Sequence, residues 1–97
     1  MGFEFAPNKD QLNLDKHGVS LSLASDLDWD AALLWIDDRR EYGETRILAL
    51  APWTSILYYV AFVDRGNVRR VISLRCANRR EVRRYVQVFE QDADPDA

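Results

Sequence analysis

Residues 65–85 read RGNVRRVISLRCANRREVRRY, and the predicted fold is organised around this stretch. Its first part, residues 68–74, has the β-branched composition of a strand. Its second part begins a helix at Asn78, which can cap the helix while Glu81, three residues later, caps it in return. Apolar residues then repeat every three or four positions, at Val82, Tyr85, Val86 and Phe89. The pattern therefore predicts a strand that leads into a helix with one apolar face.

Three segments upstream of this stretch are also predicted strands. Residues 31–36 form an apolar run that is short enough for a strand, and residues 45–51 alternate in side-chain type. Residues 56–63 are dense in β-branched and aromatic side chains, which is typical of a central strand. A turn at residues 64–67 joins this strand to residues 68–74. Together these segments predict an antiparallel meander of about four strands.

The N-terminal part of the chain is predicted to contribute helices. Residues 2–5 alternate as in a short strand, and Pro7 then suits the first turn of a helix that ends at Gly18. Ser20 can cap a second short helix that ends near residue 26. We therefore expect an α+β fold, in which a single antiparallel sheet of about four strands packs with two N-terminal helices and one C-terminal helix. The expected domain covers residues 1–90, and residues 91–97 form an acidic C-terminal tail.

The composition indicates one folded domain. The chain has 97 residues, of which 47% are hydrophobic and 11% are aromatic, so it can form one modest core. Cys76 is the only cysteine, which excludes an internal disulfide and a thiolate zinc cluster. No apolar run reaches the roughly 20 residues that span a bilayer, and the first residues do not resemble a signal peptide. These features predict a cytoplasmic protein.

Charge is segregated along the chain. Residues 65–84 contain eight arginines and one acid, a net charge of +7, whereas the whole chain carries −3. Arg75 lies near the end of a predicted strand and Arg79 near the start of the next helix, where free backbone N–H groups attract anions. A guanidinium group can bind two phosphate oxygens at once. Arg75 and Arg79 are therefore predicted to bind a phosphate group, as in a nucleic-acid backbone.

The other cationic and aromatic side chains have two interpretations each. Arg65 lies at a hairpin tip from which it could reach RNA, and Arg80 and Arg83 either bind RNA or form a solvated helix face. The solvated interpretation also suits three further arginines, Arg39, Arg40 and Arg84. The three tryptophans are Trp29, Trp35 and Trp53. They could stack on bases, although a place in the core or in a partner interface suits them better.

His17 is the single histidine of the chain, and it follows Lys16 at the end of the first predicted helix. A histidine there can cap the last carbonyl groups of the helix, or it can transfer protons near neutral pH. Lys16 is either a solvated charge at the helix end or a second proton-transfer group. No carboxylates have the spacing of a metal-binding loop, so we expect no metal and no cofactor.

Short motifs along the chain, taken in order, resemble the BrnT family. They are Phe5-Ala-Pro-Asn-Lys9, Asn13, Lys16-His17-Gly18-Val19, Gly43-Glu44-Thr45-Arg46, Tyr59 to Phe62, Arg70 to Arg75, Ala77, Glu81 and Tyr85. BrnT proteins are ribonuclease toxins of type II toxin–antitoxin systems and have a RelE-like fold. The resemblance spans roughly residues 3–86, and it implies a RelE-like toxin that cleaves RNA and thereby inhibits translation and growth.

The resemblance also implies a mechanism and a partner. RelE-like toxins cleave RNA without a metal, because the ribose 2′-hydroxyl attacks the adjacent phosphate while basic residues assist. Here Arg75 and Arg79 would stabilise the phosphate, and His17 or Lys16 would transfer protons. BrnA-type antitoxins, which carry a ribbon-helix-helix DNA-binding part, neutralise BrnT toxins. The expected assembly is a heterotetramer that contacts operator DNA only through the antitoxin, with no role for a membrane.

Departures from the family pattern support a second hypothesis. The family opens with Trp-Asp-Pro where this chain has Ala6 in the middle position, and it has Lys or Arg where this chain has Cys76. Leu74 and Ala51 replace the usual alanine and glycine. The alternative function is therefore a catalytically decayed module of the same fold, which binds nucleic acid or protein without cleaving RNA.

Overall fold

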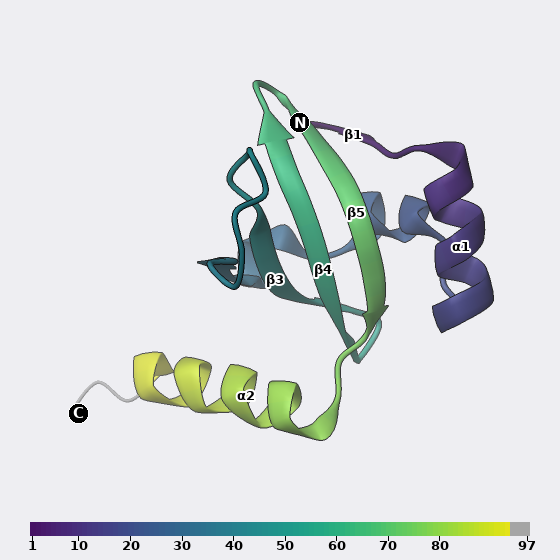
Figure 1. Ribbon diagram of the computed structural model, residues 1–97. Helices are drawn as coiled ribbons and strands as arrows, with labels where there is room; N and C mark the ends of the chain where they lie inside the picture. The colour runs from purple at the N-terminus through teal and green to yellow at the C-terminus, as the bar shows by residue number, and fades with distance from the viewer. Residues whose placement is uncertain (94–97) are drawn as a thin grey trace.

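A five-stranded sheet forms the centre of the computed structural model, which describes residues 1–93 and the side chains of residues 1–90 (Figure 1). The strands are β1 Gly2–Glu4, β2 Leu33–Ile36, β3 Ile47–Trp53, β4 Ile56–Arg65 and β5 Val68–Cys76. They lie in the order β1-β5-β4-β3-β2. Strands β2 to β5 pair antiparallel in sequence order, so the predicted meander is confirmed.

The predicted strand number and the purely antiparallel sheet are wrong because of β1. This strand pairs with β5 in parallel, with Gly2 opposite Val68 and Glu4 opposite Arg70. The sheet is therefore mixed and has five strands. Side-chain alternation in residues 2–5 predicts a strand, but it carries no information on which distant edge that strand joins.

The predicted N-terminal helices differ in kind. Helix α1, Pro7–His17, is an α-helix that ends at Gly18, whose φ of 72° is left-handed, as expected for a glycine stop. The second element, η1 Leu21–Asp26, is a 3-10 helix capped by the Ser20 hydroxyl. Asp10 of α1 ties the two together, since its Oδ1 accepts hydrogen bonds from the Leu21 N–H at 2.7 Å and the Ser20 hydroxyl at 2.9 Å. A further 3-10 turn, η2 Trp29–Ala31, precedes β2.

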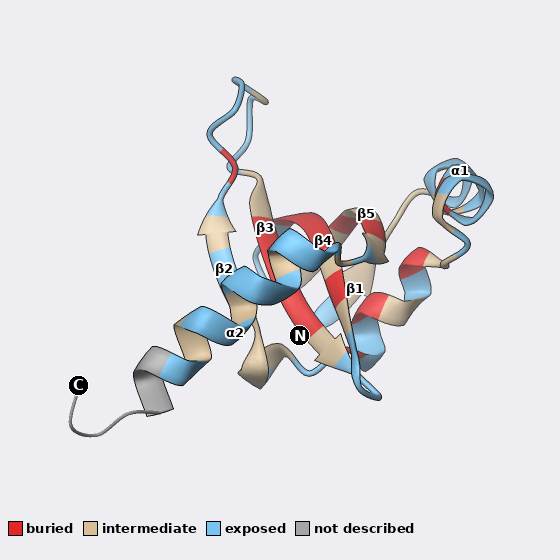
Figure 2. Ribbon diagram, turned by 90° about the horizontal axis from the view of Figure 1, so that it is seen from below, coloured by how far each residue is buried: buried red, intermediate tan, exposed pale blue. Residues whose placement is uncertain are grey.

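The hydrophobic core lies between η1 and one face of the sheet, behind the strands in Figure 1. Buried side chains from η1 and from β3, β4 and β5 form it, among them Leu21, Ala24, Ala49, Val60, Phe62, Val71 and Leu74. The indole Nε1–H of Trp29 donates to the Ala24 carbonyl at 2.8 Å. Figure 2 shows these buried segments together with the exposed surface of α1.

Helix α2, Arg79–Ala93, crosses below the end of the sheet (Figures 1 and 2). Its predicted capping box is present, because the Asn78 N–H donates to Glu81 Oε1 at 2.9 Å and the Glu81 N–H donates to Asn78 Oδ1 at 2.8 Å. The Tyr85 hydroxyl anchors the helix by donating to the Ala31 carbonyl at 2.7 Å. Residues 91–93 of the predicted tail belong to α2, and residues 94–97 lie outside the described residues. No helix in the described part of the chain could cross a membrane.

Candidate active site

A bulge in the β4–β5 pair decides which face of the sheet carries Arg75. On the core side, Arg69 of β5 stacks on the rings of Trp29 and Phe62. Strict alternation would return Arg75, six residues later, to that same side. The pairing register instead shifts between Ala61 and Phe62, and an extra residue in one strand turns the following side chains over. Arg75 therefore lies on the face opposite the core.

Backbone pairing builds a row of side chains on this open face. Tyr59 of β4 pairs with Leu50 of β3 on one side and with Arg75 of β5 on the other. In the neighbouring row, Trp35 of β2 pairs with Leu48 of β3. Directly paired residues point to the same face of a sheet, so the register alone brings these five side chains together.

Arg75 is held in one orientation by two neighbours. Its Nη1 and Nη2 donate to the two carboxylate oxygens of Glu81, each at 2.8 Å, and its guanidinium carbon lies 4.2 Å from the centre of the Tyr59 ring. The hydrogen bonds to Glu81 raise the pKa of Arg75. Burial of Glu81 opposes its ionisation, but the hydrogen bonds from Arg75 and from the Asn78 N–H lower its pKa overall. Both groups are therefore charged at neutral pH, and Glu81 is predicted correctly as a cap but has this second role.

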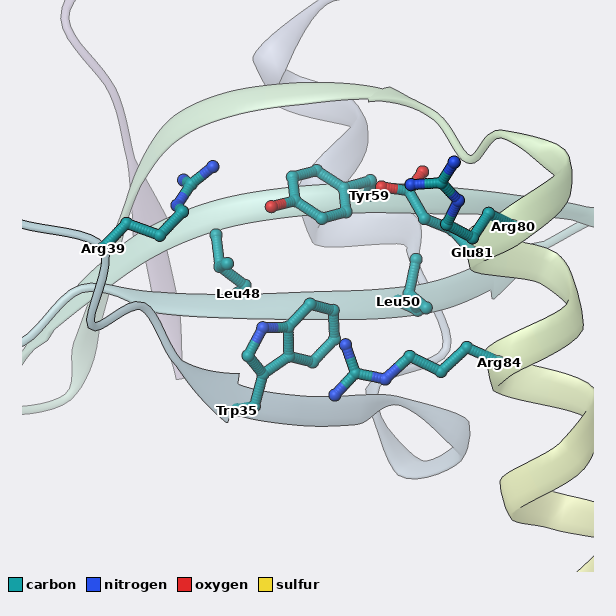
Figure 3. Close-up of a pocket in the computed structure, with 8 residues that line it drawn as sticks. All are labelled: Trp35, Arg39, Leu48, Leu50, Tyr59, Arg80, Glu81 and Arg84. Carbon is teal, nitrogen blue, oxygen red and sulfur yellow. The ribbon is translucent and has the colours of Figure 1, made fainter.

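Beside Arg75 lies a cleft of about 280 Å³ between β2 and α2 (Figure 3). Its lining combines apolar, aromatic and charged side chains, namely Trp35, Arg39, Leu48, Leu50, Tyr59, Arg80, Glu81 and Arg84. Figure 3 shows Arg84 reaching from α2 to Trp35, and its guanidinium carbon lies 4.3 Å from the centre of the indole. Arg75 borders the cleft through its contacts with Tyr59 and Glu81.

Arg39 is positioned at the cleft by the buried carboxylate of Asp37. The Arg39 Nε and Nη2 donate to the two Asp37 oxygens at 2.7 Å each, and the Tyr42 hydroxyl donates to Asp37 Oδ2 at 2.9 Å. Hydrogen bonds from Arg39 hold the pKa of Asp37 well below its usual range. Arg39 is therefore a fixed cation at the edge of the cleft, and its side chain remains 66% exposed, as the solvated interpretation predicts.

Helix α1 brings Lys16 and His17 to the edge of β5. Strand β1 pairs with β5 only as far as Arg70, and beyond that point the buried side chain of Asn13 takes the place of a strand. Asn13 Nδ2 donates to the Leu74 carbonyl at 2.7 Å, and Asn13 Oδ1 accepts from the Leu74 N–H at 3.1 Å. Beside this contact is a hollow of about 500 Å³ lined by Lys9, Leu12, Asn13, Asp15, Lys16, His17, Ile72 and Ser73.

His17 lines this hollow with an imidazole whose pKa is shifted. Its partial burial lowers its pKa, and the charges of Lys16 and Arg75 lower it further. The imidazole is therefore neutral at pH 7, and a neutral imidazole can accept a proton. The charge of Arg75 contributes to this shift, so the two side chains are close enough to interact electrostatically.

The remaining predicted residues are distributed unevenly. Arg80 lines the cleft, whereas Arg79 and Arg83 are exposed on α2 and line neither the cleft nor the hollow beside α1. Arg65 lies six residues along β4 from Tyr59, about 20 Å away at the usual rise of a strand. It pairs there with Glu44 at 2.8 Å. Arg65 is thus separated from the Arg75 site by the length of the hairpin.

Three members of the site were not predicted to be functional. The sequence allows Trp35 to stack on a base but favours the core or an interface for it, it favours a solvated helix face for Arg84, and it places Tyr59 in a strand and in a family motif without a role. Each becomes recognisable once the strand register is known, because Tyr59 pairs with Arg75 and Trp35 lies on the same face. Arg84 follows Arg80 by four residues, so both lie on one side of α2.

Comparison with known protein families identifies the family of this chain. Residues 5–81 match the family described as "Ribonuclease toxin, BrnT, of type II toxin-antitoxin system". The match includes Lys16, His17, Arg75 and Glu81, and it ends before Arg84. A comparison with curated proteins found no match. A type II toxin implies an antitoxin partner. The predicted resemblance is confirmed, and the chain belongs to the BrnT family of ribonuclease toxins of type II toxin–antitoxin systems.

Proposed function

We propose that this protein is a metal-independent endoribonuclease toxin whose cleavage centre is Arg75. The observation that carries the proposal is the position of Arg75, fixed by Glu81 and Tyr59 between the cleft and the hollow that contains His17. The charge of Arg75 influences the pKa of His17, and in this proposal a phosphate at Arg75 is within reach of the neutral imidazole and of Lys16. Those are the groups that transphosphorylation of RNA requires.

The hydrogen bonds of Arg75 leave one edge of its guanidinium group for a phosphate. Nη1 donates to Glu81 and to the Cys76 carbonyl, and Nη2 donates once to Glu81. A guanidinium group has five N–H donors, so the Nε–H and the second Nη2–H remain. These two donors lie side by side, and together they can bind two phosphate oxygens. Arg75 can therefore stabilise the charge that develops in the transition state without leaving Glu81.

The reaction proceeds by attack of the ribose 2′-hydroxyl oxygen on the neighbouring phosphorus. The bond from O2′ to phosphorus forms, and the bond from phosphorus to the 5′-oxygen of the next nucleotide breaks. His17, neutral at pH 7 because of its lowered pKa, accepts the 2′-hydroxyl proton, and Lys16 donates a proton to the leaving 5′-oxygen. The products are a 2′,3′-cyclic phosphate and a 5′-hydroxyl.

The charges around the site support cleavage without a metal ion. Guanidinium groups of Arg39, Arg75, Arg80 and Arg84 surround the cleft or border it, and they would repel a divalent cation. The 2′-hydroxyl is already held next to the phosphate, so the reaction has no need of a metal-activated water. The purified protein should therefore cleave labelled RNA in excess EDTA and leave 2′,3′-cyclic phosphate ends. Cleavage that EDTA abolishes, or fragments with 5′-phosphate ends, would contradict this mechanism.

The alternative, a decayed binding module, depends on Ala6 and Cys76. Ala6 is the N-cap residue of α1 and makes no side-chain cap. Aspartate is a preferred N-cap, so the aspartate that is usual in the family at this position would cap α1. Its absence here would therefore lower the stability of the helix rather than the rate of cleavage. Cys76 is exposed at the end of β5, where the family places one further cation. RNA binding by the wild-type protein without any cleavage would favour the alternative.

We further propose that a BrnA-type ribbon-helix-helix antitoxin neutralises the protein in a heterotetramer that reaches operator DNA only through the antitoxin. The support from the structure is an apolar area at the β3–β4 turn, where Trp53 and Ile56 are opposite each other and are 39% and 44% exposed. Tyr58, two residues further along β4, is buried and adds nothing to this area. Light scattering of the protein with the product of the neighbouring reading frame tests this assembly. Absence of a complex would contradict it.

A further inference from the structure

The cleft between β2 and α2 differs in chemistry from the other hollow that Arg39 borders. That second hollow is lined by Arg39, Arg40, Tyr42 and Arg46, so cations dominate it. The floor of the cleft, in contrast, consists of the buried side chains of Leu48 and Leu50. A phosphate has no partner on such a floor, whereas a flat, uncharged ring does. The cleft therefore suits the flat ring of a phosphate-containing ligand better than it suits the phosphate group.

Both aromatic rings of the cleft are already partners of guanidinium groups. Arg84 lies 4.3 Å from the centre of Trp35, and Arg75 lies 4.2 Å from the centre of Tyr59. The centres of the two rings are 6.1 Å apart, with an interplanar angle of 61°. Planar cations and nucleobases stack on aromatic rings in the same manner. The faces that these guanidinium groups occupy are therefore suitable for a base.

Arg84 differs from Arg75 in how firmly it is held. Arg75 has two hydrogen bonds to Glu81, whereas Arg84 makes no hydrogen bond or ion pair within the described residues and contacts Trp35 by stacking alone. A base that enters the cleft therefore displaces no hydrogen bond of Arg84. The side chain can rise from the indole and stack on the outer face of the base.

We propose that the cleft binds an unpaired nucleobase of single-stranded RNA, stacked between the indole of Trp35 and the guanidinium group of Arg84. The inference rests on the proposed function, because the phosphate of the same RNA segment is bound at Arg75. It makes single-stranded RNA the substrate class, since a base that stays paired in a duplex cannot enter a cleft. Trp35 and Arg84 would then bind substrate, whereas Glu81 positions Arg75.

The experiment measures the affinity of variants for an RNA that cannot be cleaved. The probe is a fluorescein-labelled single-stranded oligonucleotide with 2′-O-methyl riboses, because methylation removes the attacking hydroxyl. Trp35→Leu retains an apolar side chain but loses the ring, and we expect affinity to fall about 10- to 100-fold, as when one base–aromatic stack is lost. Trp35→Phe should retain most of the affinity. Trp53→Leu, at the β3–β4 turn away from the cleft, is the matched control and should bind as wild type does.

An abasic oligonucleotide of the same length separates stacking from charge. It retains every phosphate, so wild type and Trp35→Leu should bind it equally, and the dependence of affinity on salt should be the same for both. Arg84→Gln should weaken binding of the normal oligonucleotide more than of the abasic one. Equal affinity of wild type and Trp35→Leu for the normal oligonucleotide would reject the base site.

The two proposals can fail independently. The probe is uncleavable, so a protein that never cuts RNA can still show the base-dependent loss in Trp35→Leu. Conversely, a wild type that cleaves RNA, together with a Trp35→Leu variant of unchanged affinity, would reject the base site and leave the endoribonuclease. Thermal unfolding of Trp35→Leu and Trp35→Phe shows whether both variants are folded, and Trp35→Phe remains informative if the leucine variant is not.

Discussion

The β4–β5 hairpin carries an arginine–glutamate pair at each end. Both pairs have two hydrogen bonds, but they differ in their surroundings and in the edge of the guanidinium group that they use. Arg75 and Glu81 share two hydrogen bonds of 2.8 Å at one end. Arg65 and Glu44 share two of 3.0 and 2.8 Å at the other. The Arg75 side chain is 31% exposed and its partner 17%, whereas Arg65 and Glu44 are 49% and 45% exposed.

The surroundings of the two pairs explain why only one of them belongs to a site. Arg75 stacks on Tyr59, borders a cleft and lowers the pKa of His17. Arg65 lies at a hairpin tip, where water screens its charge and a surface ion pair contributes little. Both arginines belong to the same stretch of charge +7. The comparison therefore shows that charge density along the sequence does not distinguish these two arginines, whereas their neighbours in the fold do.

The largest expected effect is that of removing Arg75. Arg75→Ala should reduce RNA cleavage by about 100- to 1000-fold, as expected for loss of one well-placed donor to the transition state, and should abolish growth inhibition on expression. Arg75→Lys should restore little, because one ammonium group cannot bind two phosphate oxygens. The matched control is Arg65→Ala, which should cleave within about twofold of wild type. Equal losses in the two alanine variants would remove the distinction between the two ends of the hairpin.

His17→Ala should be the next largest change, with a loss of about 10- to 100-fold, since Lys16 can replace part of its function. The pKa of His17 is lowered by burial and by Lys16 and Arg75, and in the proposed mechanism its neutral form accepts the proton. Cleavage by wild type should therefore rise with pH through this lowered pKa, below the usual range of histidine, and level off near neutrality. The profile of single-turnover rate against pH should lose that rise in His17→Ala. A variant that retains the rise would exclude His17 as the base.

The positioning of Arg75 by Glu81 can be tested without disturbing α2. Glutamine also serves in a capping box, so Glu81→Gln should preserve the helix but remove the carboxylate that holds Arg75. We expect about a tenfold loss of cleavage from the less precise orientation of Arg75, with the substrate affinity nearly unchanged. Glu44→Gln, which removes the corresponding partner of Arg65, should have no effect on cleavage. A larger effect of Glu44→Gln than of Glu81→Gln on cleavage would contradict the positioning of Arg75 by Glu81.

A smaller effect is expected of Arg79, which is exposed at the start of α2. The affinity of wild type for RNA should fall as the salt concentration rises. The slope of log affinity against log salt concentration should be roughly −2 to −4, as expected when about three to five phosphates are neutralised. Arg79→Ala should reduce that slope by about one unit. Sequence preference should not change. Arg65→Ala again provides the control, with an unaltered slope. A binding constant that does not depend on salt would contradict phosphate recognition by this surface.

The smallest change concerns stability alone. Ala6→Asp supplies the missing cap of α1 and should raise the free energy of unfolding by about 1 kcal/mol. Because position 6 lies at the opposite end of α1 from His17, cleavage should stay as in wild type. Chemical denaturation measures the first quantity and the RNA assay the second. A gain of cleavage above tenfold would show that the aspartate contributes to the chemistry of the family.

The elements of the fold that depend on neighbours within a few residues could be predicted well. The limits of α1 follow from Pro7 and Gly18, and the capping box of α2 follows from Asn78 and Glu81. Arg75 and His17 could be predicted as candidate site residues from their residue types and from the family motifs. The roles of Trp35, Tyr59 and Arg84 could not, because each depends on a partner far away along the chain.

Most of the secondary structure, the charge segregation and the family of this protein follow from its sequence alone. Tertiary structure alone decided that β1 joins β5 in parallel, that Asn13 completes the edge of β5, and that Arg75 faces the open side of the sheet. Helix caps and strand alternation are local, so a short window of residues contains their causes. Strand register is different, because one bulged residue turns every later side chain to the other face, and only the pairing of distant strands fixes where that residue lies.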